Sequence, residues 1–432
     1  MVAVRAVDFP QTSWFNCTTP LNLIDLRGKV VLLDFFTYCC VNCINNIEVL
    51  KKLQQRYGTS LVIIGIHTPK FENEKKDKAL QSAISRLGID YAVHNDASLT
   101  LSQAYAIKAW PSMVLIDLKG YIIDTFQGET SLQVLSNALD VHLAPIPFIE
   151  KTVANKNPNA LYFPQKILCT SDYLVVANTG ANALLICNYE GEILDKVMQI
   201  PSPLGLCEYN EKIYVTSGVS NRIYRYDTSD KTLEIWCDDL ATPYDIVVVN
   251  NTLVVAMAGS HQLVAYNEDA TPVWHVGNRF EALRDGVGEA AQLAQPSGMD
   301  VDGNCIYFVD AESSSLRQCE AGVVQTLIGE GLFTFGDNNE GNILLQHPQD
   351  VSFGKIGDGC GGGRLFIADT FNSKLKVFNP ENREMMTLFE SLNEPCGLDK
   401  KGCDIYIADT NAHAIVRFNL SQMKAYPFDL YE

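Results

Sequence analysis

The chain has 432 residues and a formal net charge of −18, and 47% of its residues are hydrophobic against 19% charged. This composition is typical of a folded globular protein, and the length exceeds what one hydrophobic core usually supports. No run of 18 apolar residues occurs, which argues against a transmembrane helix, and the first residues lack the apolar stretch of a secretory signal. We therefore expect two domains, a cytoplasmic location and no membrane partner.

The acidic charge is unevenly distributed along the chain. Residues 1–150 carry a net charge of −1 and residues 151–432 a net charge of −17. A surface that binds nucleic acid needs basic side chains to neutralise phosphates. The C-terminal part is therefore not expected to bind RNA or DNA.

The thirteen cysteines fall into two groups. Three of them stand within residues 39–43, and the others are scattered singly through the chain, as at Cys169, Cys187 and Cys207. Scattered cysteines in apolar stretches favour buried, reduced thiols over a disulfide framework.

Residues 29–142 alternate between strand and helix patterns. The runs "KVVLLDFF" (29–36) and "SLVIIGIHT" (60–68) are continuous and apolar, as is typical of strands buried on both faces. Helical spacing of apolar residues follows residue 44 and recurs over 74–88 and 131–142. Shorter elements are predicted at 91–96, 98–106, 112–120 and 121–128. The alternation predicts an α/β domain over residues 1–143, with a mostly parallel sheet covered by helices. The proline-rich segment 144–163 reads as a linker.

Beyond the linker the chain repeats itself. A 14-residue window aligns six times without gaps, and each copy has two β-rich runs around a polar turn, which predicts a hairpin. The copies start at residues 174, 213, 253, 306, 365 and 405, so their spacings are 39, 40, 53, 59 and 40. Repeats of this length made of short strands predict a six-bladed β-propeller over residues 164–432, with insertions before the fourth and fifth blades. The "RFEALRDGVGEAAQLAQ" stretch and the glycine-rich stretches are assigned to those insertions. Asp310, Asp369 and Asp409 are expected to hold their own hairpin turns through backbone N–H groups.

Both parts resemble known families. The hairpin windows resemble NHL repeats, most closely at Asp369-Thr370 and Asp409-Thr410. The N-terminal part resembles thioredoxin-fold proteins of the TlpA/redoxin type, because Asp34 lies six residues before Cys40 and "IKAWPS" matches the segment that carries their cis-proline, here Pro111. With the Cys-Cys-x-Asn-Cys run and "GIHTPKFENEK", the chain resembles NHL-repeat-containing thioredoxin-like proteins. The resemblance implies a multidomain α/β and all-β protein: a thioredoxin fold followed by a six-bladed NHL-type β-propeller.

The run Cys40-Val41-Asn42-Cys43 is the candidate redox centre. At the first turn of a helix, unpaired backbone N–H groups and the helix dipole stabilise a thiolate. The resemblance implies that Cys40 is the nucleophile and Cys43 the resolving thiol. It also implies that Asp34 takes the proton of Cys43, and that Pro111 presents backbone to the substrate.

Two positions depart from the usual thioredoxin pattern. Cys39 replaces the tryptophan that commonly precedes the nucleophile, and Val41-Asn42 replaces Gly-Pro. Cys39 is either a third redox thiol or, as we expect, a packing residue. The auxiliary candidates are Tyr38, Trp110 and His67, and for the histidine we expect a hydrogen-bonded structural role. A metal site formed by Cys39, Cys40, Cys43 and His67 is a further alternative, although this spacing lacks a second ligand pair.

The sequence thus predicts a monomeric thiol–disulfide oxidoreductase without a cofactor or metal. A protein disulfide substrate or partner protein would bind through the propeller. The alternative is a non-catalytic interaction scaffold whose thioredoxin domain carries inert thiols.

Overall fold

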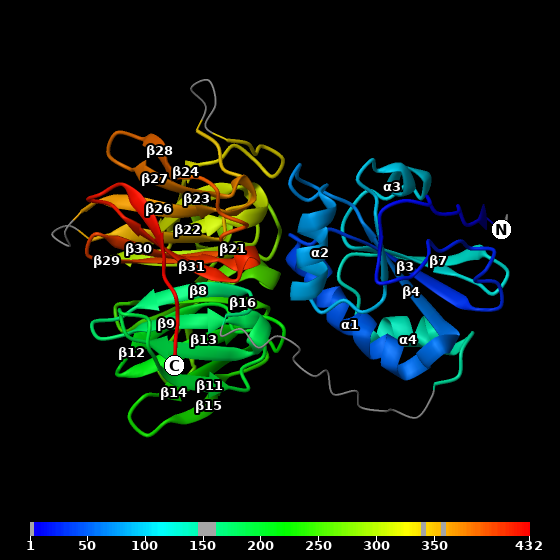
Figure 1. Cartoon of the computed structure of the whole chain (residues 1–432), viewed down its shortest axis with the longest axis horizontal. Helices are drawn as coiled ribbons and strands as arrows, with labels where there is room; N and C mark the ends of the chain where they lie inside the picture. The colour runs from blue at the N-terminus through cyan, green and yellow to red at the C-terminus, as the bar shows by residue number, and fades with distance from the viewer. Residues whose placement is uncertain (1–3, 146–160, 338–342, 356–359) are drawn as a thin grey trace. The chain divides into compact units, whose positions relative to one another are not determined.

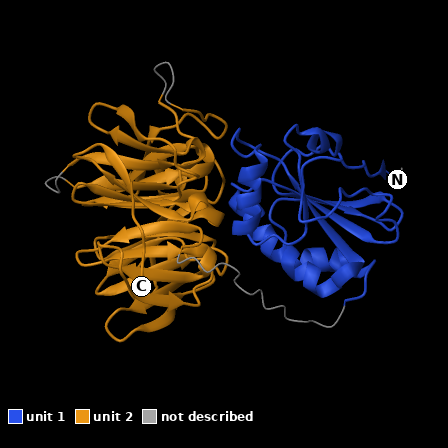
Figure 2. Ribbon diagram, in the orientation of Figure 1, with its two compact units in different colours: residues 1–154 blue, residues 155–432 orange. Residues whose placement is uncertain are grey.

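The computed structural model describes residues 4–145, 161–337, 343–355 and 360–432. The chain divides into two compact units, Met1–Ala154 and Asn155–Glu432 (Figure 2). Most of the predicted linker, residues 146–160, lies outside the described residues.

The first unit is built on one seven-stranded sheet in the order β1-β7-β6-β3-β4-β5-β2 (Figure 1). Its strands are β1 Val4–Arg5, β2 Trp14–Phe15, β3 Val30–Phe36, β4 Leu61–His67, β5 Ala92–Asn95, β6 Ser112–Ile116 and β7 Tyr121–Gln127. Its helices are α1 Val41–Tyr57, α2 Asp77–Arg86, α3 Thr100–Ala104 and α4 Leu132–Asp140, with a 3-10 turn η1 at Gly58–Ser60. From β3 to α4 these elements match the predicted order of strands and helices, whereas β1 and β2 were not predicted.

The sheet is mixed, so the expectation of a mostly parallel sheet is wrong. Strand β4 runs parallel to β3 and to β5. The β3–β6, β6–β7, β1–β7 and β2–β5 pairs are antiparallel. The short connection between β6 and β7 accounts for the direction of β7, because a tight turn can join only antiparallel neighbours.

Strand β3 is buried, and its carboxyl end leads into helix α1. All seven residues of β3 are buried, as the continuous apolar run predicts. Helix α1 buries the face that carries Ile47, Leu50 and Leu53, which recur at helical spacing. The segment that contains the three cysteines therefore joins a buried strand to a helix packed on the sheet.

Within the described residues, the second unit forms the six predicted blades, each with its first strand innermost (Figure 1). Blade 1 contains β8 Pro164–Cys169, β9 Leu174–Asn178, β10 Ala183–Cys187 and β11 Ile193–Met198; blade 2 contains β12 Leu206–Tyr209, β13 Lys212–Ser217, β14 Arg222–Asp227 and β15 Thr232–Cys237. Blade 3 contains β16 Pro243–Val249, β17 Thr252–Met257, β18 Gln262–Tyr266 and β19 Pro272–Val276; blade 4 contains β21 Pro296–Asp302, β22 Cys305–Asp310, β23 Ser315–Glu320 and β24 Val323–Ile328, with β20 Gly286–Val287 added at its outer edge. Blade 5 contains β25 Asp350–Gly354, β26 Arg364–Asp369, β27 Lys374–Asn379 and β28 Glu384–Phe389; blade 6 contains β29 Gly397–Lys401, β30 Asp404–Asp409, β31 Ala414–Asn419 and β32 Lys424–Pro427.

Short 3-10 turns close most of the predicted hairpins. They are η2 Thr179–Ala181, η3 Ala258–Ser260, η5 Ala311–Ser313, η6 Thr370–Asn372 and η7 Thr410–Ala412; η4 Gly288–Ala290 lies in the insertion before blade 4. Each hairpin turn ends in a residue with positive φ, such as Asn182 or Ser373. Polar side chains tolerate this left-handed conformation better than most others do.

The hairpin aspartates have a different role from the expected one. Asp310 accepts hydrogen bonds from the backbone N–H of Ala294, and Asp369 and Asp409 accept them from Gln346 and Asn393. Each donor lies two residues before the proline that begins the same blade. The expectation that these carboxylates bind backbone N–H groups of their own turns is therefore wrong, although Asp369 also accepts the side-chain amide of Asn372 in its own turn. They tie the entry of each blade to its second strand.

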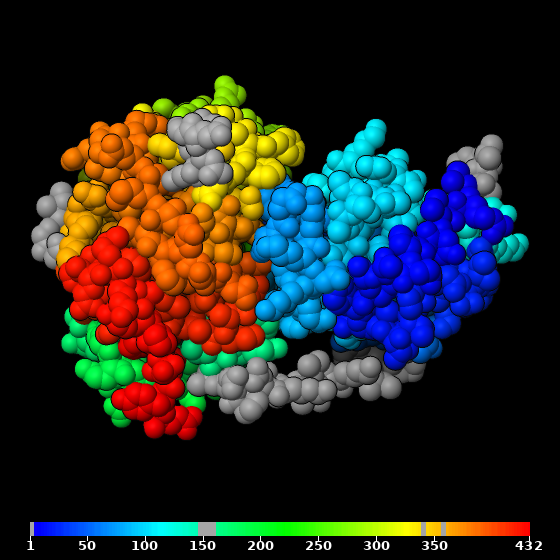
Figure 3. Space-filling view, turned by 45° about the horizontal axis from the view of Figure 1, so that its top comes forward, coloured from blue at the N-terminus to red at the C-terminus, as the bar shows by residue number. Residues whose placement is uncertain are grey.

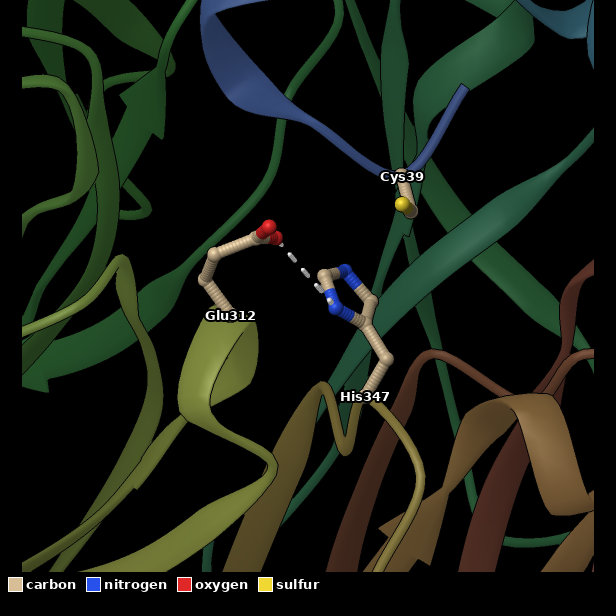
Figure 4. A group of neighbouring side chains, drawn as sticks. All are labelled: Cys39, Glu312 and His347. Carbon is tan, nitrogen blue, oxygen red and sulfur yellow. Dashed lines mark ion pairs between the residues drawn. The ribbon is translucent and has the colours of Figure 1, made fainter. Parts of the chain in front are cut away.

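The insertions before blades 4 and 5 are anchored by two buried cations. Arg317 donates to the carbonyl oxygens of Arg284 and Gln292 and pairs with Asp310 at 2.9 Å. Lys376 pairs in the same way with Asp369 at 2.6 Å. Blades 4 and 5 also approach each other at Glu312 and His347, with 3.9 Å between Oε2 and Nδ1 (Figure 4).

One part of the insertion assignment is wrong. The glycine-rich stretch 354–363 does not precede blade 5 but connects β25 to β26 inside it, with residues 356–359 outside the described part of the chain.

The centre of the propeller alternates between charged residues and glycine. Each blade has a proline at or just before its first strand. Two residues after that proline stand Lys166, Asp245 and Asp350 in blades 1, 3 and 5, and Gly205, Gly298 and Gly397 in blades 2, 4 and 6. A Cβ atom on Gly298 would lie 2.1 Å from Oδ1 of Asp350, and the other two glycines are crowded in the same way. A side chain in blades 2, 4 or 6 would therefore clash with the neighbouring blade.

The three charged side chains form one buried cluster. Nζ of Lys166 lies 2.7 Å from Oδ2 of Asp245 and 2.6 Å from Oδ1 of Asp350. Burial alone would lower the pKa of Lys166, but the two carboxylates outweigh it and raise that pKa. The same carboxylates accept the backbone N–H groups of Met299 and Leu398 in the following blades. The cluster therefore joins five of the six blades at the axis.

Blade 6 closes the ring against blade 1 through side chains and the C-terminal segment. Oδ2 of Asp399 accepts the N–H of Cys169, and the hydroxyl of Thr410 donates to the carbonyl of Pro164. Tyr431 then pairs with Glu192 beside β11, and the red C-terminal segment runs onto the green first blade in Figures 1 and 3.

We predict that Lys166→Met lowers the free energy of unfolding of the propeller by about 3–5 kcal/mol, because it leaves two buried carboxylates without their cation. The loss should grow as the pH rises, since the unpaired carboxyls are protonated in acid. Chemical denaturation followed by tryptophan fluorescence at pH 5 and pH 8 measures both effects. The matched control is Lys231→Met, which removes an exposed partner of Asp195 and should cost below about 1 kcal/mol.

If the cluster acts through its charge, adding Asp245→Asn and Asp350→Asn to Lys166→Met should restore part of the loss. A triple variant that is no more stable than Lys166→Met would show that the lysine acts through packing instead.

Candidate thiol–disulfide site

Cys40 occupies the N-cap of helix α1, and Cys43 lies in its first turn. The carbonyl of Cys40 accepts the N–H of Ile44, so the helical hydrogen bonds begin at this cysteine. Cys40 is partly exposed, whereas the side chain of Cys43 is completely buried. The structure therefore gives the two thiols different environments, one partly exposed and one buried.

Burial raises the pKa of Cys43 well above that of an ordinary thiol. A hydrogen bond to the Cys40 sulfur adds to this shift, as does the nearby charge of Asp34, while a hydrogen bond with the Thr37 backbone opposes it. Cys43 therefore stays protonated at neutral pH and needs a base before it can attack.

Asp34 is the fifth residue of β3 and is completely buried. Within the sheet it pairs with Gly65 of β4 on one side and Met113 of β6 on the other. Neither carboxyl oxygen has a hydrogen-bond partner among the described residues, and burial raises the pKa of this group to about 7. A carboxyl with this pKa can both hold and release a proton at neutral pH.

Tyr91 completes the buried polar region, and the sequence did not identify it. A Cβ atom on Gly65 would lie 3.2 Å from the ring of Tyr91, so the ring passes directly over the residue that pairs with Asp34. Its hydroxyl is buried and lacks a hydrogen-bond partner within the described chain. Burial, and then the charge of Asp34, raises the pKa of Tyr91. The glycine inside the strand was the available signal, because such a glycine often marks a close approach.

Glu74 ties the "KFENEK" segment to the cysteine loop. Its Oε1 accepts the hydroxyl of Thr37 at 2.7 Å, and its Oε2 accepts the backbone N–H groups of Lys70 and Phe71. Oγ1 of Thr37 lies 3.4 Å from the sulfur of Cys39. Since the hydroxyl proton goes to Glu74, its oxygen is left to accept the Cys39 S–H, which agrees with a packing role for Cys39. The sequence showed this segment as part of the resemblance but did not reveal its contact.

The auxiliary candidates surround the same loop. Nδ1 of the buried His67 lies 3.1 Å from Oδ1 of Asn95, and burial lowers the pKa of His67 to about 4, so the ring is neutral. Tyr38 stacks on this ring at 5.2 Å. The Trp110–Pro111 peptide bond is cis, as the resemblance implies. In the described residues, Cys39, Cys40, Cys43 and His67 do not converge as a group of metal donors.

The scattered cysteines contain one exception to the expected reduced state. Cys360 and Cys403 of the propeller form a disulfide with a Cα–Cα distance of 4.9 Å. The other eleven cysteines, all within the described residues, are free. Neither residue stands in a recognisable sequence pattern, so only the fold reveals their proximity.

Comparison with known proteins supports both units. Residues 28–122 match the family model described as thioredoxin-like. NHL repeat-containing protein 2 of Bos taurus is 29% identical over 522 residues, covering 98% of this chain and 71% of the relative. The Arabidopsis thaliana protein SUPPRESSOR OF QUENCHING 1, chloroplastic, is 27% identical over 504 residues, covering 96% of this chain and 46% of the relative. Protein DipZ of Mycobacterium bovis is 36% identical over 126 residues, covering 28% of this chain and 18% of the relative.

We predict that Asp34→Asn stabilises the first unit at pH 8 by up to about 4 kcal/mol, because it removes a carboxylate that burial disfavours. The folded-state pKa is raised above the unfolded value. The contribution of Asp34 to stability is therefore complete below about pH 4 and is lost as the pH rises through about 7. Urea unfolding of the reduced protein at pH 5 and pH 8 measures this difference.

The measurement at pH 5 is the internal comparison: the folded carboxyl is protonated there while the unfolded one is mostly ionised, so the substitution should have a smaller effect of about 1.5 kcal/mol. Equal changes at both pH values would mean that Asp34 is not the titrating group.

Proposed function

We propose that this chain, which joins a thioredoxin-like domain to a six-bladed NHL-type β-propeller, is a thiol–disulfide oxidoreductase whose redox centre is Cys40 and Cys43. The observation that carries the proposal is the unpaired, buried carboxyl of Asp34 beside a buried Cys43 that is hydrogen-bonded to Cys40. A scaffold without chemistry has no use for a buried acid that lacks a partner, because such a group costs stability. Functional sites commonly retain groups of this kind.

The reaction follows from the two thiol environments. The thiolate of Cys40 attacks a substrate disulfide, forms a mixed disulfide and releases the first substrate thiolate. Cys43 then transfers its proton to Asp34 and attacks the Cys40 sulfur. This step releases the second substrate thiolate, leaves a Cys40–Cys43 disulfide and reduces the substrate by two electrons. The reverse sequence oxidises a dithiol substrate.

Asp34 is proposed as the base for the resolving step. The pKa of Cys43 is raised by its burial, so the thiol does not ionise by itself at neutral pH. The pKa of Asp34 is raised to about 7, so about half of the molecules hold a carboxylate that can accept the proton. A carboxyl with an ordinary pKa would be a weaker base, and one with a higher pKa would be protonated already.

The propeller is proposed as the platform that binds the protein substrate. Blade end faces of propellers present loops from every repeat and suit recognition of another protein. The net charge of −17 beyond residue 150 argues against nucleic acid as the partner. We also propose that the protein is monomeric and uses no cofactor, since thiol–disulfide exchange needs none.

The cytoplasmic location also remains a proposal. The helices in the described part of the chain include none long and apolar enough to cross a membrane. The Arabidopsis relative is named as chloroplastic.

The competing function is a non-catalytic interaction scaffold. The observation that favours it is the replacement of the usual tryptophan and Gly-Pro by Cys39 and Val41-Asn42. The two functions differ in whether Cys40 turns over, which the following experiment decides.

We predict that the protein accelerates insulin reduction by dithiothreitol and that Cys40→Ser abolishes the acceleration. Cys43→Ser should instead accumulate a mixed disulfide through Cys40, which mass spectrometry detects as a linked peptide. Cys17→Ser is the matched control, because Cys17 is a partly exposed free thiol of the same unit and should leave the rate unchanged.

The mixed disulfide also tests the case of a narrow natural substrate. If Cys43→Ser forms no adduct with a panel of disulfide peptides and insulin reduction is equal in wild type and Cys40→Ser, the scaffold is correct.

We predict that the resolving step accelerates as the pH rises through about 7 and that Asp34→Asn removes this acceleration. The variant should also slow resolution at pH 8 by at least about 10-fold, because Cys43 loses its base. Rapid mixing of a preformed Cys40 mixed disulfide, with quenching by acid, measures the rate of closure. An unchanged pH profile in Asp34→Asn would assign the proton to another acceptor, for which Tyr91→Phe is the first variant to examine.

A further inference from the structure

The propeller contains a second pair of cysteines placed to exchange electrons. Cys360 lies in the connection between β25 and β26 of blade 5, and Cys403 lies in the tight turn between β29 and β30 of blade 6. They are 43 positions apart in sequence, yet their Cα atoms are separated by 4.9 Å. This distance lies within the normal range for a disulfide. The bond joins two neighbouring blades.

The two loops meet through contacts other than the sulfur–sulfur bond. The backbone N–H of Cys360 lies 3.2 Å from the sulfur of Cys403, whose carbonyl accepts the N–H of Leu420. Gly361 has a φ of +77°, and a Cβ atom there would lie 2.7 Å from Phe366 of blade 5 and 3.3 Å from Leu420 of blade 6. Only glycine lets the loop settle into this position between the blades. The cysteines therefore stay close when their bond is open, which makes its closure repeatable.

Both cysteines are accessible to small thiol reagents. Each is partly exposed, whereas Cys187, Cys207 and Cys319 of the same unit are buried, and burial raises the pKa of their thiols. A disulfide at a partly exposed surface is more open to exchange than one in a core. This pair is therefore the most accessible dithiol that the described propeller offers.

We propose that Cys360 and Cys403 form a reversible redox site whose disulfide links blade 5 to blade 6. Low-molecular-weight disulfides such as oxidised glutathione form this disulfide, and low-molecular-weight thiols such as reduced glutathione reduce it. One cysteine thiolate attacks oxidised glutathione, forms a mixed disulfide and releases one glutathione thiolate. The second cysteine thiolate attacks the protein sulfur of that mixed disulfide and releases the second glutathione. Two protein thiols lose two electrons, and the two glutathione molecules receive the electrons and the protons. The site does not depend on the proposed chemistry at Cys40 and Cys43.

Closure adds a covalent link to the packing and hydrogen bonds that already join blades 5 and 6. Phe366 of blade 5 packs in the same apolar cluster as Leu398 and Ile405 of blade 6. A covalent link across that boundary restricts the unfolded chain over the 43 positions that separate the two cysteines. The reduced protein therefore has the same fold and a lower melting temperature.

The test is differential alkylation of the full chain across a series of reduced-to-oxidised glutathione ratios, in a Cys40→Ser background. Mass spectrometry should detect a linked Cys360–Cys403 peptide whose fraction falls reversibly as reduced glutathione increases. The oxidised protein should melt at least about 5 °C above the reduced protein. Cys403→Ser should abolish both the linked peptide and the difference in melting temperature.

The matched control is Cys305→Ser, which removes a partly exposed free thiol beside the equivalent turn of blade 4 and should change neither result. Three outcomes overturn the proposal. One is the absence of a linked peptide at every ratio. Another is a linked peptide that excess reduced glutathione does not open, which would make the bond a permanent structural one. The third is a difference in melting temperature that survives in Cys403→Ser.

Discussion

The burial of Asp34 is the constraint on which the proposed chemistry depends. Its backbone pairs with β4 and β6, its carboxyl is completely buried where water cannot solvate a negative charge, and no described group donates a hydrogen bond to it. This desolvation raises the pKa of Asp34 to about 7 and, at the same time, keeps Cys43 protonated. The same physical cause therefore creates both the proton donor and its acceptor. The buried Asp34 carboxylate lowers the stability of the folded domain at neutral pH.

The propeller buries carboxylates together with cations and backbone donors. Lys166 compensates Asp245 and Asp350 at the axis, and Arg317 compensates Asp310. In these clusters the charges also accept backbone N–H groups, so the desolvation cost is offset and the groups hold blades together. Burial still raises the pKa of Asp310, and it raises that of Asp350 to about 7. What distinguishes Asp34 is that its carboxyl oxygens have no hydrogen-bond partner among the described residues. Asp409 lacks such a cation but accepts the backbone N–H of Asn393, and burial raises its pKa to about 6.

The sequence was most informative where a pattern repeats or a spacing is rigid. Six gapless windows were enough to predict the blades, because each hairpin buries the same positions, and Asp34 could be placed because it stands at a fixed distance from Cys40. Properties set by tertiary contacts were not predictable. The direction of β6 relative to β3 follows from no local pattern, and the donors to the hairpin aspartates lie in another part of each blade. Likewise, no local sequence pattern shows that the ring of Tyr91 lies over Gly65 or that Cys360 lies next to Cys403.

The two cysteine pairs illustrate how environment, rather than residue type, sets what a thiol does. Cys43 is buried, and in the proposed mechanism exchange at Cys40 and Cys43 is coupled to the protonation of Asp34 and limited to partners that reach Cys40. Cys360 and Cys403 are partly exposed on loops, so solvent supplies and removes their protons. The first pair is therefore suited to turning over a bound substrate, and the second to reporting the redox state of the surrounding solution. Because neither depends on the other's protons, each can change state while the other remains fixed.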